Sequence, residues 1–119
     1  MAHNDSTIIK ASIWATPTNS GPNLEGYWGV LVTVENHGDY LIHNSPSSGT
    51  VATAASNMSS LWSKVRDIPV ATNDKTIRGC MKASHGAATN YVSSALTRYL
   101  MGVTCVGTAA KIGAYLISK

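Results

Sequence analysis

One cysteine stands where a helix is expected to begin, and it is the strongest chemical signal in this 119-residue sequence. Cys105 follows Thr104, whose hydroxyl can cap the first turn of a helix. Free backbone amides and the helix dipole favour the thiolate form of a cysteine in a first turn. The position therefore predicts either a reactive nucleophile or a small apolar residue packed beneath the start of the helix.

A thiolate nucleophile needs a base that packed structure holds in place. Of the four histidines, only His43 is expected at the end of a strand, where a neighbouring helix could bring a cysteine to it. We expect His3 in a terminal tail, His37 in a turn and His85 in a loop. His43 is thus the candidate base, and a purely structural role is its alternative.

Other kinds of site find little support in the sequence. Cys80 and Cys105 could form one disulfide bridge in an oxidising compartment. The sequence contains no Cys-x-x-Cys and no His-x-x-x-His spacing, so we expect no metal site. Glycine motifs that cradle a nucleotide are also missing, and we expect no cofactor.

The elements that must position Cys105 and His43 follow from residue types and periodicity. Strands are predicted where β-branched and aromatic residues gather, at residues 7–14, 28–34, 39–43, 50–54, 64–70 and 76–81. Pro69 places the strand at 64–70 on a sheet edge or at a bulge. Apolar residues at helical spacing predict helices from residue 89 to 102 and from residue 105 to 117. The expected class is α+β, an antiparallel sheet with two C-terminal helices on one face.

The turn between the second and third strands decides which way His43 points. A four-residue turn puts His43 on the face of Trp28, and a five-residue turn puts it on the face of Tyr27. The sequence leaves both registers open.

Composition bounds the remaining possibilities. The length predicts one domain over residues 1–119. The formal net charge is +3, and the nine Lys and Arg residues are spread along the chain, so the electrostatic case for nucleic acid is weak. No apolar run is long enough to span a membrane, and no secretory signal is visible, so we expect a cytoplasmic protein.

Four segments, taken in order, resemble the lecithin retinol acyltransferase family over residues 6–116. This family includes the HRAS-like suppressor phospholipase/acyltransferases and the H-box/NC type of picornavirus 2A protein. Residues 27–32 (Tyr-Trp-Gly-Val-Leu-Val) resemble its H-box, and residues 40–46 (Tyr-Leu-Ile-His-Asn-Ser-Pro) resemble its second histidine segment. Residues 54–59 resemble the small-residue stretch that follows, and Thr104-Cys105 stands where the family has Asn-Cys. The resemblance implies a permuted papain-like (NlpC-type) fold.

The resemblance also implies roles for three residues. Cys105 matches the nucleophile of the family, and His43 matches a polar residue that normally orients the base. Tyr27 stands in the position of the H-box histidine, the general base of active members. A phenol with a reference pKa near 10 is a poor base at neutral pH.

We therefore expect a non-catalytic or weakly active H-box/NC domain that acts through host or viral proteins, most like a picornavirus 2A protein in the host cytoplasm. The alternative is a cysteine-dependent phospholipase or acyltransferase, with Cys105 as nucleophile and His43 as base. Tyr27 would then supply a hydrogen bond to the oxyanion or to the histidine. A third reading is an RNA-binding accessory domain, supported by the charge of +3 and the Tyr and Trp residues.

Overall fold

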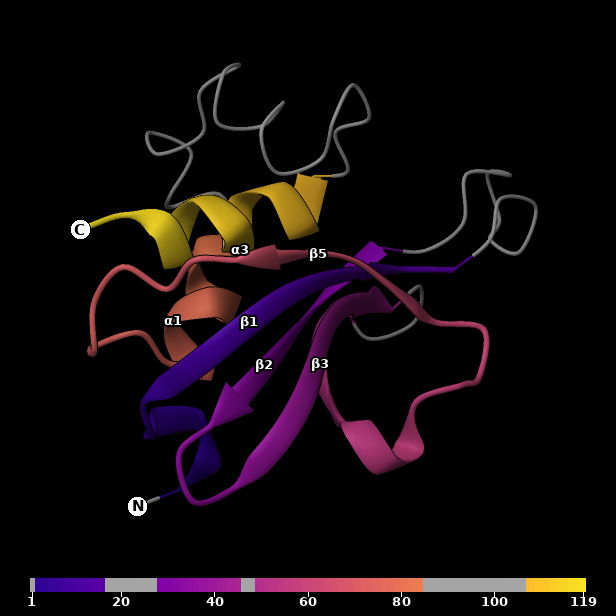
Figure 1. Ribbon diagram of the computed structural model, residues 1–119, viewed down its shortest axis with the longest axis horizontal. Coiled ribbons are helices and arrows are strands. Elements are labelled where there is room, and N and C mark those ends of the chain that lie inside the picture. Colours follow the sequence, from indigo (N-terminus) through magenta and orange to yellow (C-terminus); the bar gives the residue numbers. More distant parts are fainter. Residues whose placement is uncertain (1, 17–27, 46–48, 85–106) are drawn as a thin grey trace.

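An antiparallel five-stranded sheet forms the centre of the described part of the protein, with the strand order β4-β3-β2-β1-β5. Strands β1, β2, β3 and β5 are labelled in Figure 1. The computed structural model describes residues 2–16, 28–45, 49–84 and 107–119. Its strands are β1 (Ile8–Ala15), β2 (Trp28–Val34), β3 (Gly38–Ser45), β4 (Gly49–Ala54) and β5 (Ser63–Ile68). Its helices are η1 (His3–Asp5), η2 (Ala55–Asn57), α1 (Ile77–Lys82) and α3 (Gly107–Ile117). The predicted α+β class, an antiparallel sheet followed by helices, is confirmed.

The hairpin of β2 and β3 follows from the chemistry of its turn. Val34 pairs with Gly38, so only Glu35, Asn36 and His37 connect the strands. Asn36 (φ 65°) and Gly38 (φ 86°) adopt the left-handed backbone region, which asparagine and glycine tolerate best. The predicted turn is confirmed. It contains three residues, whereas the two predicted alternatives contained four and five.

The two edges of the sheet differ. β4 pairs with β3 in one continuous register. β5 pairs with β1 through a bulge, where the register shifts between Ile13 and Trp14. Pro69, which has no amide to donate, comes directly after the last residue of β5. The prediction that this segment forms an edge strand is confirmed.

The predicted strand at residues 76–81 is wrong, because this segment begins a helix. Thr76 caps α1, and its hydroxyl accepts a hydrogen bond from the amide of Gly79 at 3.0 Å. Ile77 and Cys80, three residues apart, are both fully buried on the inner side of this helix. The β-branched Thr76 and Ile77 favour a strand by propensity, but the cap and the burial of one helical face outweigh that preference.

Helices α1 and α3 cover one face of the sheet, called the helix face (Figure 1). Their buried residues, among them Ile77, Ile112 and Leu116, pack against alternate strand residues to form the core. The helix face is lined by Ile8, Ala11, Ile13, Val30, Val32, Val34, Ile42 and Ile68. The predicted apolar stripe of the last helix is confirmed at Ala109, Ile112 and Leu116. The predicted helix at residues 89–102 lies outside the described residues.

The opposite side of the sheet, called the second face, carries the other strand residues. Strand alternation places Ser12, Trp14, Leu31, Leu41, His43 and Thr53 there. The connection from β4 to β5 joins opposite edges of the sheet, and on the way its Trp62 contacts His43. Leu41 is only 1% exposed although it lies outside the core cluster, which shows that part of this face is covered.

The N-terminal segment packs against the sheet, so the expectation that His3 lies in a tail is wrong. The His3 ring stacks on Tyr40, with ring centres 4.6 Å apart and planes 8° from parallel. Asp5 forms a two-bond ion pair with Arg78 of α1. Ring stacking and this ion pair together hold η1 in place.

Lys75 is a buried cation, with 6% of its surface exposed. Its carbonyl accepts a hydrogen bond from the amide of Ile8 at 2.8 Å. Its ammonium donates to the hydroxyl of Ser118 at 3.1 Å and lies 4.7 Å from the centre of the Tyr115 ring. This one residue therefore joins the start of β1 to the end of α3.

Candidate functional site

Of the three predicted site residues, His43 is the one that the structure describes. Cys105 and Tyr27 lie outside the described residues. The site is therefore built from His43 and the side chains around it.

The backbone register places His43 on the second face. His43 pairs with Gly29 across the hairpin, so the two residues point to the same side of the sheet. Trp28 belongs to the opposite side, where it packs against the core. A three-residue turn and a five-residue turn differ by two residues, so both put each side chain of β3 on the same face of the sheet. The structure therefore has the register that turns His43 away from Trp28.

Gly29 allows the strands to approach closely at this point. A Cβ atom at Gly29 would lie 3.0 Å from the carbonyl oxygen of Ile42 and 3.0 Å from a methyl group of Leu41. It would also lie 3.2 Å from the Cβ atom of His43. A side chain at position 29 would therefore displace the neighbours that hold the imidazole.

Two side chains hold the imidazole. The Nε2 atom of His43 is 3.1 Å from the Thr53 hydroxyl, which lies on the same face of the neighbouring strand β4. Trp62 comes from the connection between η2 and β5, and its ring packs edge-on with its centre 5.8 Å from that of the imidazole. Neither contact was predicted from the sequence. Strand alternation could have indicated Thr53, but no local signal brings Trp62 to His43.

Burial sets the protonation of His43. Desolvation lowers the pKa of the half-buried imidazole from its ordinary value of 6.5, because a charged ring loses water here without gaining an anionic partner. The ring is therefore neutral at pH 7, with one nitrogen as donor and the other as acceptor. Such a ring can accept a proton or fix a neighbouring hydroxyl.

Cys80 is a free thiol buried in the core. Burial raises its pKa, and the nearby Lys75 ammonium opposes this rise only in part. A buried neutral thiol is a poor nucleophile. Cys80 thus acts as a small apolar residue of the core.

Within the described ranges, no three His, Cys, Asp or Glu side chains gather closely enough to hold a metal ion. None of the helices that the structure describes is long and apolar enough to cross a membrane.

Comparison with known proteins gives one viral relative. No protein-family model matches the chain, and no solved structure gives a significant match. The sequence is 33% identical over 90 residues to "Uncharacterized protein R800" of Acanthamoeba polyphaga mimivirus. The match covers 72% of this chain and 70% of the mimivirus protein. The chain therefore belongs to the same family as this mimivirus protein.

Proposed function

We propose that this chain is a non-catalytic domain of the H-box/NC type, with a permuted papain-like frame, that acts by binding proteins. The order of elements supports the frame: a strand, a hairpin that carries His43, two further strands, the short helix α1 and a final helix that the structure describes from Gly107, two positions after Cys105 in the sequence. An antiparallel sheet with helices on one face is also what the resemblance implies.

The direction in which His43 points carries the non-catalytic part of the proposal. A general base must come within hydrogen-bond reach of the thiol, about 2.6–3.2 Å or one water away. The imidazole lies on the second face, between Thr53 and Trp62, whereas helix α3 packs on the helix face. His43 therefore has a structural partner already, and Tyr27 offers a phenol where active members have a second imidazole.

The mimivirus relative supports a viral setting for the proposed protein binding. We propose partners among host or viral proteins, in the host cytoplasm, by analogy with the picornavirus 2A proteins that the sequence resembles. This analogy concerns the type of action, binding in place of catalysis.

Alkylation of the thiols across the pH range tests the proposal. Native protein is treated with iodoacetamide between about pH 5 and 9, and mass spectrometry assigns the modification to each cysteine. We expect Cys105 to be alkylated with the pH dependence of an ordinary thiol, and this dependence to be unchanged in His43→Gln. Cys80 reports global unfolding, because it is buried in the folded protein.

A thiolate at Cys105 well below pH 7 that disappears in His43→Gln would overturn the non-catalytic proposal. It would favour the second candidate, a cysteine-dependent acyltransferase. One observation supports that candidate: the lowered pKa keeps His43 neutral, the form that a general base requires. Trapping an acyl group on Cys105 with an activated ester would establish it.

A further inference from the structure

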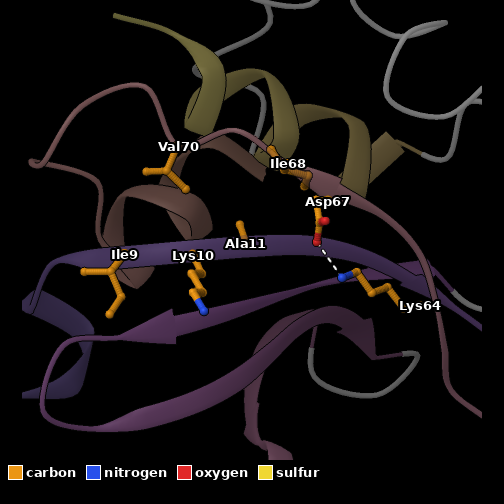
Figure 2. A pocket seen from close by; sticks show the side chains of 7 residues that line it. All are labelled: Ile9, Lys10, Ala11, Lys64, Asp67, Ile68 and Val70. Atoms are coloured by element: carbon orange, nitrogen blue, oxygen red, sulfur yellow. Dashed lines mark ion pairs between the residues drawn. The ribbon is translucent and has the colours of Figure 1, made fainter.

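A groove opens at one edge of the sheet, where β5 stops pairing with β1. The last residue of β5, Ile68, pairs with Ala11, and the chain then leaves β1 until the carbonyl of Lys75 meets the amide of Ile8. The groove between β1 on one side and β5 with the segment after it on the other has a volume of about 460 Å³, within the range of ligand-binding pockets. This edge groove is lined by Ile9, Lys10, Ala11, Lys64, Asp67, Ile68 and Val70 (Figure 2).

One end of the edge groove is apolar. Ile9 and Val70 lie at this end, on β1 and on the segment that follows β5 (Figure 2). Ile9 is 51% exposed, which leaves much of a large apolar side chain in water. A large apolar side chain inserted between Ile9 and Val70 would remove this surface from water and gain hydrophobic free energy.

The charges of the edge groove do not balance. Lys64 and Asp67 form an ion pair at 2.6 Å (Figure 2). Lys10 also lines the groove, its side chain points to the opposite side of β1 from Ala11 (Figure 2), and the described residues give it no carboxylate partner. The groove therefore presents one positive charge beside its apolar end, and it favours an occupant that places a carboxylate there.

From these observations we propose that the edge groove binds an extended segment of a partner protein that carries a large apolar residue next to acidic residues. The apolar side chain enters between Ile9 and Val70, and a carboxylate meets Lys10. A second copy of this chain is a poorer occupant, because each copy has a net charge of +3. This inference rests on the proposed function, since it names the kind of partner that a binding domain would hold.

Fluorescence anisotropy with defined peptides tests the proposal. The probe is a fluorescein-labelled Asp-Leu-Asp-Trp-Asp-Leu-Asp peptide, measured with the full chain at about 20 and about 150 mM salt. One control peptide has Lys in place of every Asp, and another has Ser in place of Leu and Trp. We expect only the acidic and apolar probe to bind at both salt concentrations.

Two variants and two matched controls locate the binding site. We expect Lys10→Glu to weaken binding about tenfold, through lost attraction and added repulsion. We expect Ile9→Ala to weaken it about fivefold, because part of the apolar contact is lost. Lys82→Glu makes the same charge change at an exposed site on α1, and Leu61→Ala removes a 55% exposed side chain outside the groove. Both controls should bind as the unmodified protein does.

Three results would overturn the proposal: no binding of the probe, equal losses in Lys10→Glu and Lys82→Glu, or tighter binding of a short oligothymidylate that Lys10→Glu abolishes. The last result would assign the groove to nucleic acid. The outcome is separable from the proposed function, because the alkylation of Cys105 does not depend on the groove. An unreactive Cys105 with no peptide binding rejects this inference alone, whereas a catalytic Cys105 with groove-dependent binding rejects only the non-catalytic proposal.

Discussion

The two faces of the sheet are built from the same strands and differ in almost every physical respect. In β2, Val30, Val32 and Val34 point to the helix face, and each is no more than 1% exposed. The residues between them, such as Leu31 and Thr33, are only half-buried on the second face. Strand alternation thus separates a closely packed apolar layer from a partly open layer of mixed polar and apolar residues.

This difference assigns different tasks to the two faces. The helix face holds the fold together, because its side chains interlock with those of α1 and α3. The second face holds His43 between a hydroxyl and an indole, a half-buried setting that lowers the pKa of the imidazole. Substitutions should therefore change stability on one face and titration on the other.

The largest effect is expected from shortening a core side chain. Ile112→Ala on α3 removes a fully buried side chain and should lower the free energy of unfolding by about 2–5 kcal/mol. Ile9→Ala makes the same chemical change at an exposed position and should cost less than about 1 kcal/mol. Urea unfolding measures both. Equal losses of stability in the two variants would contradict the distinction between the buried helix face and the exposed surface.

A smaller effect is expected where α1 meets α3. A Cβ atom at Gly79 would overlap the hydroxyl and ring of Tyr115. Alanine normally stabilises a helix relative to glycine, but here we expect Gly79→Ala to destabilise the protein by about 1–2 kcal/mol. Chemical denaturation gives the value, and Tyr115→Phe in the same chain should restore part of it because the hydroxyl is gone. A gain in stability in Gly79→Ala would show that the helices are loosely packed.

The smallest effect concerns pH and the second face. The pKa of His43 is lower in the folded protein than in the unfolded chain, so the unfolded state binds more protons below about pH 6.5. The contribution of His43 to stability is therefore complete above that pH and is lost as the pH falls through the folded-state pKa. Urea midpoints measured at several pH values should show this loss, and His43→Gln should reduce it.

Trp62→Ala provides the control for the cause of this shift. Removing the indole exposes the imidazole to water, so the pKa of His43 should rise towards its ordinary value. An NMR titration of the imidazole proton reports it directly. An unchanged pKa would mean that Trp62 does not shield His43.

The sequence predicted the elements whose signals are local. β2 spans the predicted residues 28–34, because alternating valines favour a strand and the Asn36 and Gly38 turn ends it. α1 was mistaken for a strand, because six residues contain too few helical repeats for periodicity to outweigh two β-branched side chains. The residue that indicates the helix is Thr76, which caps its first turn. The burial of Ile77 and Cys80, which favours the helix over a strand, is known only from the structure.

The surroundings of the site were less predictable than the strands. His43 was identified as a strand residue. The direction of its side chain depends on the length of the turn, three residues, and residue propensities do not determine that length. Trp62 reaches His43 from 19 positions along the chain, and Lys75 is buried by contacts with Tyr115 and Ser118. Such contacts arise from tertiary packing, which local residue patterns do not encode.

The position of Lys75 has a consequence for how the molecule opens. Its carbonyl binds the first amide of β1, and its ammonium binds beyond the end of α3. Fraying at either terminus must break contacts of the same residue, so the two ends are expected to exchange their amide hydrogens together, as one cooperative unit. Since β1 also forms one wall of the edge groove, lifting the C-terminal helix would loosen that wall.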